Sequence, residues 1–373
     1  MMVHQKLLFI VTEDWYFVSH RLPLAAAAKK AGYDVAVATR VRSHGQAITA
    51  EGIRLIPFIL SRHVGNPIRE VVALTRLYVR ERPDIVHHVA LKPIVYGVLA
   101  ARIAGVRAQV NAVAGMGRLF TSTTGVMRLI RPAARWILAL LLRGRRSLTI
   151  VQNSDDRALL LRSHLPESRI HLIRGAGVDT TLFAPGSEPA QPIRIVLAAR
   201  MLWAKGVREF VQAASLLAEE GIVARFILAG LPDYGNPESV PEETLREWDG
   251  KNGVEWRGLC NDMPSVFRES HVSCLPSYYG EGVPKALLEA AASGLPIVTT
   301  DIPGCREIVR NDENGILVPA KNPHALATAL RRLIQDPSLR SKMGQCGRAM
   351  VLDKFSQERV IKETLAAYRE LAT

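Results

Sequence analysis

The chain has 373 residues, of which 48% are hydrophobic, and it carries a formal net charge of +13. This length suits two domains of ordinary size, and the hydrophobic content excludes an intrinsically disordered chain. The four cysteines are widely spaced and include no Cys-x-x-Cys pair, which argues against a disulfide framework or a structural zinc site and fits a reducing compartment.

The first half of the chain alternates apolar, strand-like runs with helical patterns. Its N-terminus runs directly into the first of these strands, without the pattern of a signal peptide. Strands are predicted at residues 7–11, 34–39, 85–89, 108–113 and 148–152, and helices at 20–31, 67–82 and 93–104. This alternation predicts an α/β domain with a parallel sheet and helices on both faces.

The positive charge is concentrated in residues 1–185, which contain 26 Lys and Arg against 11 Asp and Glu. Within this half, residues 126–146 combine arginines with an apolar run from Trp136 to Leu142 that is too short to span a bilayer. Arginines around an apolar face are typical of a helix that lies on an anionic membrane surface. The alternative is a core helix with a solvated basic rim.

A second α/β series begins after the Pro- and Gly-rich stretch 183–192, which we interpret as an interdomain linker. Strands are predicted at 193–199, 226–229, 254–257, 272–275 and 296–299, and helices at 206–220, 284–293, 324–335, 339–353 and 357–371. The predicted domains are residues 1–184 and 185–356, and we expect the C-terminal helix 357–373 to pack back on the first domain. Two doubly wound Rossmann-like domains would face a central cleft at which strand ends meet a ligand.

Two cations mark the start of the second domain. Arg200 follows its first strand, and Lys205 precedes the next helix. In a doubly wound sheet both lie at the ligand-binding edge, beside a helix N-terminus. The forked donors of Arg, the point charge of Lys and the N–H groups of a helix end together suit a diphosphate. Taken alone, an Arg and a Lys at this spacing are more often surface charges.

A second group of candidate residues follows the strand 272–275. Residues 281–283 form a predicted turn, Pro284 suits the first position of a helix, and Glu289 lies inside that helix among Ala and Leu. The N–H groups of the turn can meet phosphate or sugar oxygens. A carboxylate on an apolar helix needs a partner, which the hydroxyl pair of a ribose or hexose would supply. A solvated glutamate at the rim of the helix is the alternative.

Together these motifs resemble glycosyltransferase family 4, whose members have the GT-B fold. The run Pro276–Val309 carries the Glu-x7-Glu signature of the family as Glu281 and Glu289. Residues 175–185 resemble its Gly-Val-Asp segment, and Asn314–Pro319 resembles a later loop. The resemblance covers most of the chain.

The resemblance implies a retaining glycosyltransferase that needs no bound metal and no other cofactor. The absence of an Asp-x-Asp motif from the sequence agrees with this expectation. In the implied roles Arg200 and Lys205 hold the donor diphosphate, Glu289 holds the nucleoside ribose, and Glu281 contacts the transferred sugar. The backbone around Glu281 completes the implied donor site, through Gly282, Val283, Pro284 and Lys285.

Three segments of the first half, at 19–24, 83–93 and 111–117, resemble a family 4 subgroup that assembles bacterial surface polysaccharides and glycans on undecaprenyl diphosphate. The implied acceptor-side candidates are Ser19, His20, Arg21, His88, Lys92, Asn111, Gly115 and Gly117. His20 and His88 are also candidates for a catalytic role, with a capping or core role as the alternative. The sequence departs from the family pattern at Thr12–Phe17, which replaces a Gly-rich loop, and at Asn111–Gly117, which replaces a histidine.

We therefore expect a cytoplasmic enzyme, peripheral on the inner face of the cell membrane, that serves polysaccharide biosynthesis. It would move a hexose or N-acetylhexosamine from a nucleotide-sugar, expected to be UDP-linked, to a lipid-diphosphate-linked saccharide. The alternative is a sugar-nucleotide epimerase or hydrolase of the same architecture. Nucleic-acid binding is disfavoured because no recognisable module accompanies the basic residues. An NAD-dependent oxidoreductase is disfavoured because no G-x-G-x-x-G follows the first strand of either domain.

Overall fold

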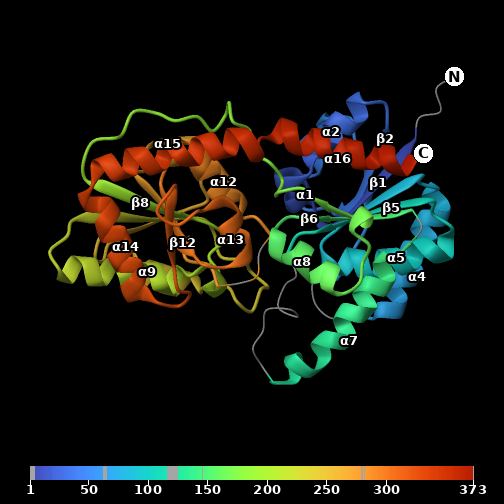
Figure 1. The fold of residues 1–373 in the computed structure, drawn as a ribbon, viewed down its shortest axis with the longest axis horizontal. Helices are drawn as coiled ribbons and strands as arrows, with labels where there is room; N and C mark the ends of the chain where they lie inside the picture. Colours follow the sequence, from blue (N-terminus) through green and yellow to red (C-terminus); the bar gives the residue numbers. More distant parts are fainter. Residues whose placement is uncertain are drawn as a thin grey trace. The chain divides into compact units, whose positions relative to one another are not determined.

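The computed structural model describes residues 5–61, 65–115, 125–144, 146–278, 280 and 282–372. The chain divides into two compact units (Figure 1). The N-terminal unit comprises Met1–Ala176 with Gln357–Thr373, and the C-terminal unit comprises Gly177–Ser356. Each is a doubly wound α/β domain built on a parallel sheet. No helix in the described ranges combines the length and the apolarity needed to span a bilayer.

The N-terminal unit contains a seven-stranded parallel sheet of order β3-β2-β1-β4-β5-β6-β7. Most of its strands are short, buried apolar runs, as a sheet covered on both faces requires. They are β1 Lys6–Glu13, β2 Asp34–Arg40, β3 Arg54–Pro57, β4 Ile85–Val89, β5 Ala108–Val113, β6 Ser147–Val151 and β7 Ile170–Leu172. The strand order reverses between β1 and β4, so the carboxyl ends of these two strands mark the usual ligand-binding point.

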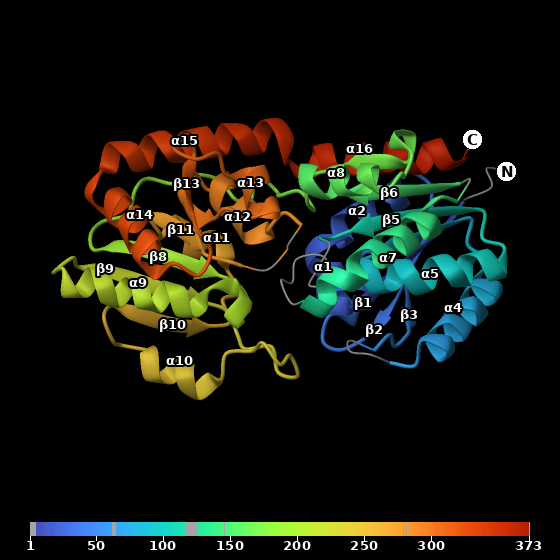
Figure 2. The same ribbon diagram turned by 60° about the horizontal axis from the view of Figure 1, so that its bottom comes forward.

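Helices cover both faces of this sheet. They are α1 Asp14–His20, α2 Leu22–Lys30, α3 Gly45–Ala50, α4 Pro67–Glu81, α5 Leu91–Ala104, α7 Gly125–Leu142, α8 Ser154–Arg162 and α16 Gln357–Ala372, with the short helix η1 Glu167–Arg169. One face packs against α4, α5 and α7, and the opposite face packs against α1, α2 and α16 (Figure 2).

The predicted helix 20–31 is wrong at its start, because two helices, α1 and α2, meet at Arg21. Pro23 explains the break, since it lacks an N–H group and its ring would clash with the carbonyl of Ser19 in a continuous helix. The segment Thr12–Phe17, which stands in place of the family's Gly-rich loop, completes β1 and begins α1 at Asp14.

The C-terminal unit contains a six-stranded parallel sheet of order β10-β9-β8-β11-β12-β13. The strands are β8 Ile193–Ala198, β9 Ala224–Ala229, β10 Val254–Gly258, β11 Val272–Leu275, β12 Ile297–Thr300 and β13 Gly315–Val318. The helices are η2 Trp203–Lys205, α9 Val207–Glu219, α10 Glu242–Trp248, α11 Met263–Arg268, α12 Lys285–Ala292, α13 Pro303–Ile308, α14 Pro323–Gln335 and α15 Pro337–Lys354. Here the strand order reverses between β8 and β11.

The boundary between the units lies after Ala176, earlier than the predicted position after residue 184. The backbone N–H of Val178 donates to the carbonyl of Phe355 at 3.0 Å, and Phe183 is buried in the core of the C-terminal unit. These contacts tie the segment 177–184 to the second unit. The last helix, α16, packs on the core of the N-terminal unit through Val360, Ala367 and Tyr368.

Candidate functional site

The loops that carry the donor-site candidates contact each other at the carboxyl edge of the C-terminal sheet. Gly206 has a φ of 76°, and a Cβ at this position would lie 2.2 Å from the carbonyl oxygen of Pro276, so only glycine fits. The Ser277 hydroxyl and the Tyr278 N–H both donate to the carbonyl of Ala204, at 3.1 and 3.0 Å. The structure therefore joins the segment that ends in Lys205 to the segment that leads into α12, at the switch point between β8 and β11.

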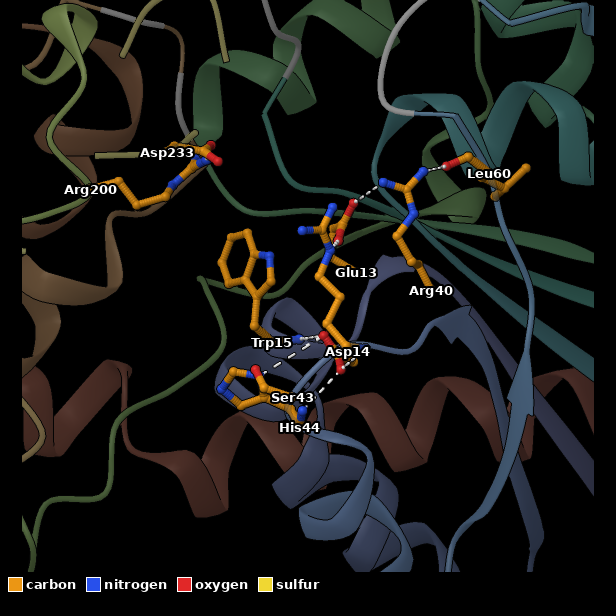
Figure 3. Close-up of polar contacts among 10 residues, drawn as sticks. Glu13, Asp14, Trp15, Arg40, Ser43, His44, Leu60, Arg200 and Asp233 are labelled. Carbon is orange, nitrogen blue, oxygen red and sulfur yellow. Dashed lines mark hydrogen bonds and ion pairs between the residues drawn. The ribbon is translucent and has the colours of Figure 1, made fainter. Parts of the chain in front are cut away.

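Arg200 lies in the first of these loops and forms an ion pair with Asp233. Its Nη1 is 2.5 Å from the Asp233 carboxylate (Figure 3). Asp233 follows β9, and its own N–H donates to the Ser239 hydroxyl at 3.0 Å. The side chain of Arg200 is 43% exposed, and so exposed an ion pair contributes little to stability. An anionic ligand can therefore compete with Asp233 for this guanidinium.

Asp233 is a residue that the sequence reasoning missed. Its only signal is its place shortly after a strand, β9, that ends at the same edge of the sheet as β8. A second missed residue is Lys321, which follows β13 and places its Nζ 4.5 Å from the centre of the Tyr278 ring. Lys321 adds a cation to the edge that holds Arg200 and Lys205.

Glu289 lies on α12 and pairs with Lys285 one helical turn earlier, with 3.2 Å between the Lys285 Nζ and the carboxylate. Its side chain is only 12% exposed. Burial raises the pKa of Glu289, and the Lys285 charge only partly opposes that shift. The Glu289 carboxylate therefore already has a partner on this apolar helix. That partner is Lys285, which is itself a donor-site candidate. An approaching hydroxyl pair would meet a carboxylate that is already positioned.

The other donor-site candidates lie at the entry to α12. Gly282, Val283 and Pro284 are buried, and Pro284 occupies the N-cap position rather than the predicted first helical position. Glu281 lies outside the described residues, so its predicted contact with the sugar remains a prediction.

Acidic residues occupy the carboxyl end of β1 in the N-terminal unit (Figure 3). The buried Asp14 carboxylate accepts the backbone N–H groups of Trp15, Arg42 and His44 at 2.7, 2.6 and 3.0 Å. Burial raises the pKa of Asp14, but these hydrogen bonds outweigh it and hold the pKa below its ordinary value. Asp14 thereby fixes the loop after β2.

Glu13 is buried beside Asp14 and forms ion pairs with Arg40 and Arg42, each at 3.3 Å. The Arg40 guanidinium also donates to the carbonyl of Leu60 at 3.2 Å. Glu13 and Asp14 were not among the predicted site residues, although two acids at the end of a buried strand are a recognisable signal. Their contacts organise the loops at the ligand-binding edge of this sheet.

His88 and Asn111 are core residues in the structure, which for His88 is the core role given as the alternative to an acceptor-side role. Both side chains are fully buried. The His88 Nε2 lies 3.0 Å from the Tyr78 hydroxyl, and its Nδ1 lies 2.8 Å from the Asn111 side-chain oxygen. The Asn111 amide in turn donates to the Ser147 hydroxyl at 3.0 Å. Both ring nitrogens are therefore used inside the fold.

The remaining acceptor-side candidates have different surroundings. Ser19 and His20 lie in the last turn of α1, and the His20 ring stacks on Tyr16 with 4.2 Å between the ring centres. Arg21 is only 5% exposed, and its Nε–H finds no hydrogen-bond partner among the described residues. Lys92 forms an ion pair with Glu70 at 3.1 Å. Gly115 has a φ of 104°, and Gly117 lies outside the described residues.

Comparison with known families matches both units. The model for glycosyl transferases group 1 matches residues 178–350, and the model for glycosyl transferase 4-like domains matches residues 6–153. The N,N'-diacetylbacillosaminyl-diphospho-undecaprenol alpha-1,3-N-acetylgalactosaminyltransferase of Campylobacter jejuni is 27% identical, over 87% of this chain and 88% of the relative. The UDP-Gal:alpha-D-GlcNAc-diphosphoundecaprenol alpha-1,3-galactosyltransferase of Escherichia coli is 26% identical, over 76% of this chain and 75% of the relative.

The fold matches solved structures along its whole length. The Anabaena protein HepE, solved in complex with UDP and glucose, aligns with a TM-score of 0.80 at 16% identity, over 98% of this chain and 100% of HepE. This likeness confirms the predicted GT-B fold of two Rossmann-like domains. Because one family model matches each unit, and because relatives align with most of the chain, the protein belongs to the family 4 glycosyltransferases, with a 4-like domain followed by a group 1 domain.

Proposed function

We propose that this glycosyltransferase moves a hexose or N-acetylhexosamine from a UDP-sugar to a saccharide carried on a lipid diphosphate, with retention of configuration and without a metal ion. The observation that carries the proposal is the junction of the two loops after β8 and β11, held by the Ala204 carbonyl and by Gly206. It gathers cations at a strand edge where the charge of a nucleoside diphosphate can be neutralised.

In this proposal the donor diphosphate takes over part of the contact that Arg200 now makes with Asp233, and Lys205 supplies a second positive charge. Glu289 accepts hydrogen bonds from the ribose, and Glu281 contacts the transferred sugar with the backbone of Gly282–Lys285. As the bond between the sugar and the diphosphate breaks, Arg200 and Lys205 stabilise the charge that develops on the leaving group.

The names of relatives support the choice of substrates. Both the Campylobacter and the Escherichia relative are named for transfer to a sugar on diphospho-undecaprenol, and the Escherichia name gives UDP-galactose as donor. HepE was solved with UDP. For this chain we propose the same classes of donor and acceptor, in bacterial surface-polysaccharide synthesis on the cytoplasmic face of the membrane.

The acceptor would bind at the N-terminal unit. His20 and Arg21 remain its candidate contacts, together with Ser19 and Gly115 from the predicted acceptor-side residues. His88 and Asn111 instead support the fold as buried core residues. The basic helix α7, with Trp136 exposed on it, is proposed to bring the enzyme to an anionic membrane surface.

Substitution of two donor-site residues tests the proposal. We expect Lys205→Ala and Glu289→Ala each to lower the turnover of a UDP-sugar by about 100-fold or more, since each removes one preorganised charge contact. Arg225→Ala and Glu219→Ala, at exposed positions of the same unit, are matched controls and should keep normal turnover. Addition of EDTA should leave the wild-type rate unchanged.

Thermal unfolding of each variant would separate a lost contact from a lost fold. Near-normal turnover in both Lys205→Ala and Glu289→Ala would contradict the assignment of the donor site. A rate that collapses with EDTA and returns with a divalent cation would contradict only the metal-independent part.

A further inference from the structure

The outer side of α4 carries an unexpected apolar stripe. Ile68, Val72 and Val79 are all exposed, with 75% of Ile68 and 56% of Val79 accessible to solvent. Their spacing of four and seven residues puts them on one face of the helix. The residues of α4 that pack on the core occupy the opposite face, and they are Glu70, Leu74, Leu77 and Tyr78. Helix α4 is therefore apolar on the side that faces away from the protein.

Two neighbouring helices repeat this arrangement. On α5, Leu99 and Ile103 are exposed, and Ile103 is 69% accessible. On α7, Trp136 and Leu140 are exposed, and Trp136 is 64% accessible. Each pair has the i, i+4 spacing of neighbours on one helix face.

The three helices form one layer on the same face of the N-terminal sheet. Helix α5 packs against both α4 and α7 (Figure 2). The Arg102 guanidinium on α5 also donates to the carbonyls of Leu140 and Leu141 at 3.1 and 2.7 Å, which fastens α5 to the end of α7. The exposed apolar side chains thus belong to a single surface, which we term the outer helical face and define as Ile68, Val72, Val79, Leu99, Ile103, Trp136 and Leu140.

Positive charge accompanies these apolar side chains. Helices α5 and α7 contain no Asp or Glu. The two glutamates of α4 are already paired, Glu70 with Lys92 and Glu81 with Arg54 and Arg80. On the described parts of these helices the exposed charged side chains are Arg69, Arg76, Arg80 and Arg102, and the exposed Arg143 directly follows α7.

We propose that the outer helical face is the membrane-docking surface of the enzyme, and that α4 and α5 contribute to it as well as α7. An anionic bilayer fits both of its properties, because apolar side chains enter the interfacial region while arginines contact lipid phosphates. A second copy of the chain fits less well, since a two-fold contact would place the same arginines opposite each other. The inference rests on the membrane-linked acceptor of the proposed function and extends it to a defined surface.

Vesicle co-sedimentation of the full chain tests this surface. The vesicles contain phosphatidylglycerol with phosphatidylcholine, or phosphatidylcholine alone. We expect the wild type to bind the anionic vesicles more tightly. The double variant Ile68→Ser/Val79→Ser on α4 and the single variant Ile103→Ser on α5 should each weaken that binding about fivefold or more. Val223→Ser, at an exposed valine of the C-terminal unit, is the matched control.

Three results would overturn the inference. The first is wild-type protein that stays in solution with anionic vesicles, and the second is an effect confined to Trp136→Ser while the α4 and α5 variants bind normally. The third is a dimer by light scattering that the variants convert to monomer, which would assign the face to a second copy. Turnover on a water-soluble acceptor with a short alkyl chain, measured in the same preparations, keeps the two proposals separate. If the wild type shows no such turnover, the proposed function is contradicted. The vesicle result is then judged independently of it.

Discussion

The surroundings of His88 decide whether it is a core residue or a ligand-binding residue. The sequence places it near the end of a strand beside a second histidine, as expected for a ligand-binding edge, and it was predicted as an acceptor-side residue. In the structure every residue of β4 is buried, so strand periodicity could not distinguish a core side chain from one that reaches the edge. The deciding contacts come from Tyr78 and Asn111, on other elements, and these long-range partners cannot be predicted from local pattern.

The buried state of His88 has a measurable consequence for stability. Burial lowers its pKa to about 4, and the hydrogen bond with Asn111 offsets only part of the shift. The unfolded chain, with a histidine pKa near 6.5, therefore binds the proton first as the pH falls. We expect the stability contribution to be complete above about pH 6.5 and to decline toward pH 4, with a slope of about 1.4 kcal/mol per pH unit from this residue.

Urea unfolding at several pH values checks this expectation. His88→Gln should lower the free energy of unfolding overall and remove about that slope between pH 5 and 6. His324→Gln, at an exposed histidine, is the control variant. An unchanged slope in His88→Gln would mean that the folded protein already protonates the ring, contrary to its burial.

At the scale of elements, the apolar pattern predicted α5 and its neighbours well, because their existence depends on local periodicity. The break between α1 and α2 was missed, although Pro23 is a local signal that could have revealed it. What local pattern cannot supply is the reason for Gly97 in the middle of α5. A Cβ at this position would lie 2.3 Å from the His88 ring, so the helix uses glycine to let a buried side chain of β4 pass.

This contact predicts the sign of a substitution. Gly97→Ala would stabilise a helix by about 1 kcal/mol from propensity alone. We expect it instead to destabilise the protein by about 1–3 kcal/mol, because the methyl group overpacks the core against the His88 ring. In a His88→Ala background the ring is absent, and the same change should become neutral or stabilising.

A double-mutant cycle by urea denaturation measures this coupling. A stabilising Gly97→Ala in the wild-type background would show that the helix can shift away from the ring. Equal effects in the two backgrounds would also contradict the proposed contact.

At the scale of the whole molecule, the sequence predicted two doubly wound domains and the motifs of a donor site, because strand–helix alternation and short motifs are local. The domain boundary was predicted after residue 184, whereas the units divide after Ala176. Local pattern could not show this, because the hydrogen bond between Val178 and Phe355 joins segments far apart in the chain. Asp233 and Lys321 were missed for the same reason, because only the folding of the sheet brings the ends of different strands to one edge.

Arg200, Lys205, Lys285 and Glu289 lie on loops and a helix at one strand switch point, which supports the proposed donor site. The acceptor side differs most from its prediction, because two of the predicted acceptor-side residues, His88 and Asn111, lie in the core. In the proposed function, the acceptor contacts on this unit are left to His20 and Arg21.

The most direct measurement is the transfer reaction itself. The full chain is incubated with a UDP-sugar and an undecaprenyl-diphosphate-linked saccharide, and the acceptor is followed by mass spectrometry and its new linkage by NMR. We expect the acceptor to gain one hexose or N-acetylhexosamine in α linkage, and UDP release to depend on the acceptor. UDP release or sugar epimerisation with the donor alone, without any change in the acceptor, would contradict this expectation.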